Sequence, residues 1–265
     1  MQTSGISILG CGWLGLPLAN FLIRKGFQVY GSTTSKEKLA ILRQNNIRAF
    51  ELLLNPNAMG NDWYDFLENP TLIINIPPKI QEFGQDFHVK QIENLLRLVV
   101  KSNVRRIFYI SSTSVYPEKN QVVCENSEVL SEHTLVKAEN LLLSLPQIQI
   151  MILRCGGLMG ENRIAGKSLA GKKTNTGSMP VNFIHREDVI RIIFQLLAKK
   201  VEKEIFNIVA PLHPTRQEVY AAQAQKYNFA KPIFEKADLP YKIVDSSKIQ
   251  NFLNYEFLFP NPAEF

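Results

Sequence analysis

Residues 9–15 read LGCGWLG and follow a short apolar segment, GISIL, at residues 5–9. The stretch carries the G-x-G-x-x-G spacing of a dinucleotide-binding turn, formed by Gly10, Gly12 and Gly15. Residues 13–25 continue with apolar side chains at helical spacing, so the motif joins a predicted strand to a predicted helix. In that setting the first glycine permits a tight turn, the second admits a pyrophosphate and the third lets helix and strand pack closely.

The same alternation continues along the chain. Further apolar segments predict strands at residues 27–31, 47–52, 71–77, 105–112 and 148–154, with helical patterns between most of them. This order is typical of an α/β fold, a Rossmann-type doubly wound parallel sheet. From residue 155 the sequence becomes rich in Gly, Lys, Ser, Asn and Thr. We therefore expect a dinucleotide-binding core over residues 1–155 and a small C-terminal, substrate-side lobe over 156–265, interleaved with the core as a single compact unit.

Composition narrows the class of protein. The chain has 265 residues, 45% of them hydrophobic, and a formal net charge of +6. Its basic residues are scattered and no basic block alternates with aromatics, so we expect no nucleic-acid partner. No apolar run approaches the ~18 residues of a membrane span and no secretory signal begins the chain, which predicts a cytoplasmic protein without a membrane partner. The three cysteines and four histidines lack ligand spacing, so we expect no metal site.

The end of the second predicted strand bears on the choice of dinucleotide. An NAD site usually has Asp or Glu there to bind the ribose 2′-hydroxyl, whereas this chain reads GSTTSK at residues 31–36. Hydroxyls and a lysine suit a 2′-phosphate, so we expect NADP, with NAD as the alternative; the same residues also suit a loop that caps the next helix. NIPP at residues 75–78 supplies apolar walls after the fourth strand. The residues expected to bind the cofactor are Gly10, Gly12, Trp13, Leu14, Gly15, Ser32, Thr33, Thr34, Lys36, Ile76 and Pro77.

Three later segments resemble the extended short-chain dehydrogenase/reductase family, which contains nucleotide-sugar epimerases and dehydratases. They are YISSTSVYP at residues 109–117, ILRCGGLMG at 152–160 and VNFIHREDVIRII at 181–193. The chain is most similar to an atypical bacterial branch of NAD(P)-dependent epimerase/dehydratase-like proteins, which share GWLG in the glycine loop. The resemblance covers nearly the whole chain. It implies a nicotinamide cofactor and a small-molecule substrate, with a nucleotide sugar and a homo-oligomer among the expectations.

The resemblance also implies catalytic positions. In that family a serine or threonine four residues before the VYG tyrosine binds the reacting oxygen, and here this is Ser112. A Tyr-x-x-x-Lys pair on the next helix supplies the acid/base and holds the nicotinamide ribose. This chain has no tyrosine between Tyr116 and Tyr220, and the matching register holds His133 and Lys137. An imidazole suits proton transfer near neutral pH, but the pair also fits a polar helix start followed by a solvated lysine.

Two functions follow from these residues. The first is an NAD(P)-dependent oxidoreductase or epimerase that acts on a small alcohol, carbonyl or nucleotide sugar. Ser112 would then bind the oxygen, His133 would carry the proton and Lys137 would hold the ribose. The second is a catalytically degenerate NADP-binding redox sensor or regulatory protein, because the family's tyrosine is missing. The position of His133 relative to the nicotinamide discriminates between the two.

Overall fold

The computed structural model describes residues 5–55 and 61–265. Over this part of the chain a seven-stranded parallel sheet has the order β11-β7-β5-β4-β1-β2-β3. Its strands are β1 (Ile6–Leu9), β2 (Val29–Thr33), β3 (Arg48–Glu51), β4 (Thr71–Ile74), β5 (Arg106–Ser112), β7 (Gln149–Cys155) and β11 (Lys203–Ile208). The chain starts in the middle and moves first to one edge and then toward the other, which is the doubly wound Rossmann arrangement. The predicted fold class is therefore confirmed.

Internal contacts divide the chain into two compact units. The first unit contains the chain up to Ser111, Ser131–Leu153 and Lys199–Ile205. The second unit contains Ser112–Leu130, Arg154–Ala198 and Phe206–Phe265. The predicted core over residues 1–155, with an interleaved lobe over 156–265, stays a prediction.

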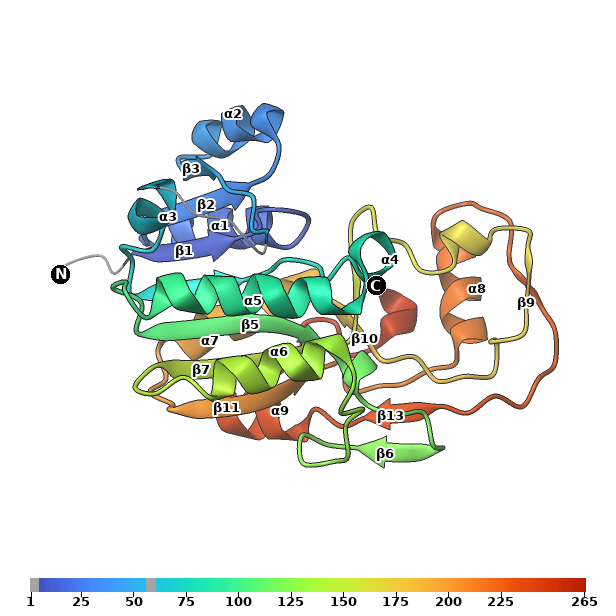
Figure 1. Cartoon of the computed structure of the whole chain (residues 1–265). Coiled ribbons are helices and arrows are strands. Elements are labelled where there is room, and N and C mark those ends of the chain that lie inside the picture. The colour runs from blue at the N-terminus through green and yellow to red at the C-terminus, as the bar shows by residue number, and fades with distance from the viewer. Residues whose placement is uncertain (1–4, 56–60) are drawn as a thin grey trace. The chain divides into compact units, whose positions relative to one another are not determined.

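The first unit is organised around β1. Its residues Ile6, Ile8 and Leu9 are fully buried, and the strand pairs in parallel with both β2 and β4. Burial on both faces explains why the segment is continuously apolar rather than alternating. The helices of this unit are α1 (Gly15–Arg24), α2 (Lys36–Gln44), α3 (Asn61–Phe66), α4 (Ile80–Phe83), α5 (Gln85–Val99) and α6 (Thr134–Leu143). Helices α5 and α6 lie side by side (Figure 1).

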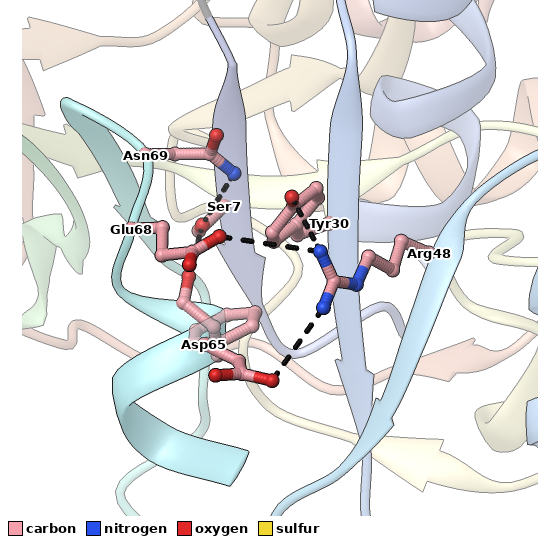
Figure 2. Close-up of polar contacts among 7 residues, drawn as sticks. Ser7, Tyr30, Arg48, Asp65, Glu68 and Asn69 are labelled. Atoms are coloured by element: carbon pink, nitrogen blue, oxygen red, sulfur yellow. Dashed lines mark hydrogen bonds and ion pairs between the residues drawn. The ribbon is translucent and has the colours of Figure 1, made fainter. Parts of the chain in front are cut away.

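Polar contacts tie the amino-terminal end of this sheet to α3 (Figure 2). The guanidinium of Arg48 on β3 donates to the Tyr30 hydroxyl at 2.7 Å and lies 3.5 Å from the carboxylate of Asp65. Asn69 donates to the hydroxyl of Ser7 on β1 at 3.0 Å. The ion pair is half exposed and adds little to stability. The Arg48 contacts join the edge strand β3 to β2 and α3, and the Asn69 bond joins the interior strand β1 to the segment after α3. They lie near the strand starts, which leaves the carboxyl ends of the strands to the site.

The second unit contains α7 (Arg186–Leu197), α8 (Arg216–Lys226) and α9 (Ser247–Leu253). Three short parallel pairs join β10 (Phe183–His185) to β8 (Gly157–Met159), β12 (Ile233–Phe234) to β9 (Lys173–Thr174), and β13 (Lys242–Val244) to β6 (Gln121–Val123). Single turns of 3₁₀ helix occupy Thr113–Val115, Lys167–Leu169 and Pro262–Glu264.

A buried carboxylate on α7 holds the C-terminal segment of this unit. Asp188 accepts hydrogen bonds from the Tyr255 hydroxyl at 2.7 Å and from the backbone N–H groups of Leu258 and Phe259. Three donors offset the cost of burying one charge. Among the residues placed by the structure, no helix combines the length and apolarity that a membrane crossing requires.

Candidate functional site

The glycine loop joins β1 to α1, and each of its three glycines meets a different constraint. Gly10 has a φ of +101°, and a Cβ there would lie 2.4 Å from the carbonyl oxygen of Asn75. A Cβ on Gly15 would lie 2.2 Å from the carbonyl oxygen of Gly10. A Cβ on Gly12 would meet no atom within 4 Å. The first and third glycines are therefore needed for the turn and its packing, while the second leaves open space beside the start of a helix.

Side chains from two neighbouring strands hold this loop in place. The backbone N–H of Gly10 donates to the hydroxyl of Ser32, at the end of β2, at 3.0 Å. The side-chain amide of Asn75, just after β4, donates to the carbonyl oxygen of Gly10 at 3.0 Å. The loop is thus bonded to the carboxyl ends of both strands that flank β1. This edge of an open α/β sheet is where ligands bind.

A cavity of about 300 Å³ lies at this edge, within the first unit. We call it the first-unit cavity. Its volume is at the lower end of the range for small-ligand pockets. Seven residues expected to bind the cofactor line it, namely Gly10, Gly12, Ser32, Thr33, Thr34, Ile76 and Pro77. Leu52, Leu53 and Leu54 after β3 add an apolar wall.

The other expected cofactor residues lie outside this lining. Leu14 is buried, Trp13 is half-buried, and Gly15 packs against the loop itself. Lys36 is exposed at the first position of α2, and the lysine of that helix that lines the cavity is Lys38. Two residues along an α-helix differ in direction by about 200°. The spacing of the two lysines at a helix start therefore already indicates that their side chains point in different directions.

Cys11 lines the same cavity but offers no nucleophile. Burial raises the pKa of its thiol to about 12, so the sulfur stays protonated at neutral pH. Its sulfur fills the space beside Gly31, where a Cβ would lie only 2.7 Å away. The residue therefore packs the glycine loop against β2.

Ser112 ends β5 and belongs to the second unit. Its hydroxyl accepts a hydrogen bond from the backbone N–H of Ser114 at 3.1 Å and so caps the single 3₁₀ turn that follows. The residue lines a cavity of about 230 Å³, which we call the second-unit cavity. Charged side chains in its lining are those of Glu118, Arg216 and Lys242.

His133 and Lys137 lie at the start of α6, in the first unit. The Nδ1 atom of His133 accepts a hydrogen bond from the backbone N–H of Leu135 at 3.2 Å, so the imidazole caps the helix. The Lys137 ammonium lies 2.9 Å from the Glu132 carboxylate, and this contact raises the pKa of Lys137. The lysine therefore stays cationic. Because Ser112 belongs to the other unit, the convergence of the three side chains stays a prediction.

Tyr116, the tyrosine of the SVYP segment, is structural. Its hydroxyl donates to the side-chain oxygen of Asn207 at 2.7 Å and accepts from the guanidinium of Arg154 at 2.8 Å. Burial raises the pKa of this phenol. A buried hydroxyl with both roles occupied has no place in proton exchange with a substrate. It instead links the segment after β5 to β7 and β11.

Comparison with known proteins places the chain in a family. No family model matches it. The protein YeeZ of Escherichia coli K12 is 33% identical over 265 residues, and the alignment covers 97% of both chains. The chain belongs to the YeeZ family. YeeZ carries no stated activity in its name, so this membership by itself assigns no reaction.

Solved structures share the fold of this YeeZ relative at lower identity. A UDP-glucuronic acid 4-epimerase variant from Bacillus cereus, bound to a fluorinated UDP-sugar and NAD, has a TM-score of 0.81 and 19% identity and covers 98% of this chain and 96% of its own. The UDP-glucose 4-epimerase of Thermotoga maritima, solved with UDP-glucose, has a TM-score of 0.76 and 16% identity, with 96% and 94% covered. At these identities the likeness shows the Rossmann fold.

Proposed function

We propose that the protein binds a nicotinamide dinucleotide and acts as an oxidoreductase or epimerase on a small alcohol or carbonyl compound, with nucleotide sugars as the leading substrate class. The observation that carries the proposal is the first-unit cavity, built on a glycine loop that leaves space at Gly12. Support for the substrate class comes from an epimerase of the same fold solved with UDP-glucuronic acid and NAD.

The residues of this cavity fit such a cofactor. A pyrophosphate needs backbone approach and donors at a helix start, which the Gly12 position and the first turn of α1 offer. The hydroxyls of Ser32 and Thr33 suit a ribose, and the leucines at 52–54 suit an apolar base. When bound, the nicotinamide supplies hydride exchange, while the protein orients the reactants.

NADP is the form of the cofactor that we propose. Among the residues that the structure describes, no Asp or Glu lines the first-unit cavity, so none of them would repel a 2′-phosphate there. Lys38 does line it and carries the positive charge that a phosphate requires, together with the hydroxyls of Thr33 and Thr34. Lys38 therefore replaces Lys36 as the proposed phosphate ligand.

Isothermal titration calorimetry with NADPH and NADH tests the cofactor. We expect NADPH to bind more tightly, and Lys38→Ala to lose about 1.5–3 kcal/mol of NADPH binding, the value of a hydrogen bond to a charged group. Lys36→Ala is the matched control because it removes the same charge from the same helix outside the cavity. Equal affinities for NADPH and NADH would refute the preference, and no binding of either would refute the proposed function.

A substrate screen tests the reaction. Sugar nucleotides and small carbonyl compounds are incubated with either cofactor, net redox change is followed by absorbance of the reduced cofactor, and epimer formation by NMR, because epimerisation leaves the cofactor unchanged overall. In this proposal Ser112 binds the reacting oxygen and Lys137 the nicotinamide ribose, with His133 the proton carrier expected from the sequence. Ser112→Ala should then cost about 2.7–4 kcal/mol of transition-state stabilisation, the usual value of one oxyanion donor.

A second candidate function is a redox sensor that binds the cofactor without turnover. The contacts of α6 favour it, because His133 caps the helix and Lys137 pairs with Glu132. Tight NADPH binding together with no product in the screen would select the sensor. Turnover of any screened compound would exclude it.

A further inference from the structure

The second-unit cavity contains an amine that the sequence did not point to. Lys242 begins β13, which pairs with β6, and lines the same cavity as Ser112. Its side chain is only 10% exposed. A lysine this buried needs partners for its ammonium group, since an unpaired buried charge is costly.

The partners of this amine are few and well placed. Nζ donates a hydrogen bond to the carbonyl oxygen of Tyr116 at 2.6 Å and lies 3.9 Å from the carboxylate of Glu118, whose side chain is 46% exposed. One bond to a carbonyl leaves further hydrogens of an ammonium available to a ligand. Burial lowers the pKa of Lys242, and Glu118 opposes that shift. The amine is therefore more easily deprotonated than a surface lysine.

We propose that Lys242 is the proton carrier of the reaction, exchanging a proton with the substrate oxygen that Ser112 binds. This inference rests on the proposed function. In oxidation of an alcohol, the C–H bond breaks and the hydrogen leaves with its electron pair as hydride, for which a bound oxidised nicotinamide dinucleotide would supply the acceptor. The O–H bond breaks and its proton passes to the neutral amine, leaving a C=O bond and an ammonium group. In reduction the ammonium returns the proton to the oxygen as the carbon receives hydride.

The other titratable groups of this cavity suit the role less well. A guanidinium does not exchange protons in proteins, so Arg216 can hold an anion but not act as the proton carrier. Glu118 is half exposed and close to the amine, where it stabilises the ammonium form. Tyr241 also lines the cavity, and its Phe variant separates its role from that of Lys242. His133 belongs to the first unit, whereas Lys242 and Ser112 line one cavity within one unit.

A labelling experiment measures how easily the Lys242 amine loses its proton, and it needs no substrate. The full chain is acetylated with trace acetic anhydride over a pH series. Peptide mass spectrometry then gives, for each lysine, the pH at which acetylation is half-maximal, which we call its labelling midpoint. We expect Lys242 to label with a lower midpoint than Lys119, a surface lysine of the same unit paired with Glu128. Glu118→Gln should lower the Lys242 midpoint further, because it removes the charge that opposes the shift. A midpoint for Lys242 equal to that of Lys119, or above it, would overturn the proposal.

Kinetics with a compound found by the screen test the proton transfer itself. Lys242→Ala should lower kcat at least 100-fold, the lower range for loss of an acid/base, while NADPH affinity stays within twofold. Added ethylamine should restore part of the rate, whereas Lys242→Arg should stay inactive because a guanidinium keeps its proton. The matched control, Lys119→Ala, should keep the wild-type rate. The phenol variant, Tyr241→Phe, should keep a higher kcat than Lys242→Ala.

The outcomes separate this inference from the proposed function. A wild type that binds no dinucleotide, or turns over no compound, refutes the proposed function and the role of Lys242 with it. A wild type that binds and turns over, together with a Lys242→Ala variant of normal kcat, refutes only the role of Lys242. A Tyr241→Phe variant as inactive as Lys242→Ala, or an inactive Lys242→Ala variant without amine rescue, also overturns it.

Discussion

Alanine substitutions in the glycine loop should separate binding from folding. At Gly12 an added Cβ meets no atom within 4 Å, so Gly12→Ala should change the free energy of unfolding by no more than about 0.5 kcal/mol. The same methyl group stands where a pyrophosphate would approach the backbone. We therefore expect Gly12→Ala to fold normally and to lose most of its affinity for the dinucleotide.

At Gly10 the expected effect is on stability. Its φ of +101° lies in the region that residues with a Cβ avoid, at a cost of about 1–3 kcal/mol. The Cβ would also lie 2.4 Å from the carbonyl oxygen of Asn75, which is backbone and cannot rotate away. Overpacking of this kind typically costs a further ~1–3 kcal/mol. The sum, roughly 2–6 kcal/mol, lowers the thermal midpoint by roughly 4–24 °C at about 2–4 °C per kcal/mol.

Gly26→Ala is the matched control for the backbone contribution. Gly26 has a φ of +87°, but a Cβ there would meet no atom within 4 Å. It should therefore show the conformational cost without the collision, and Gly10→Ala should be the more destabilised of the two. Thermal and urea unfolding followed by circular dichroism measure the stabilities, and calorimetry measures NADPH binding. The reasoning fails if Gly12→Ala binds NADPH like the wild type, or if Gly10→Ala is no less stable than Gly26→Ala.

Three further predictions concern groups outside the glycine loop. Tyr116→Phe removes the buried hydroxyl that bonds both the Arg154 guanidinium and the Asn207 side chain, so urea unfolding should show a loss of about 1–3 kcal/mol; an unchanged midpoint would contradict it. Asp188→Ala removes the acceptor of three hydrogen bonds from the C-terminal segment, and limited proteolysis should cut that segment faster than in the wild type. Burial lowers the pKa of His88 below 6.5, so the unfolded state binds more protons than the folded state as the pH falls. The histidine's contribution is thus complete above about pH 6.5 and is lost below it, and His88→Gln should flatten this dependence in urea titrations.

The sequence by itself determined the fold and the position of the glycine loop. Apolar strands, helical spacing and three glycines are local signals, and each constrains the backbone through its own side chains or their absence. The turn at position 10 requires a glycine whatever surrounds it. The buried β1 is recognisable in the sequence because both faces of a central parallel strand are apolar. Seven of the expected cofactor residues line the first-unit cavity because they end or closely follow strands whose carboxyl ends meet at one edge.

The tertiary structure decided which polar side chains reach a cavity. The helical spacing alone shows that Lys36 and Lys38 differ in direction, but only the packing of α2 against its neighbours decides that Lys38 reaches the cavity. Lys242 carries no motif, and its place in the cavity that Ser112 also lines follows from the pairing of β13 with β6, two short strands far apart in the chain. Burial also depends on packing, and it is burial that raises the pKa of Cys11 and lowers that of Lys242. Such contacts between distant segments leave no periodic signal, because each depends on how the whole chain folds rather than on its neighbours in sequence.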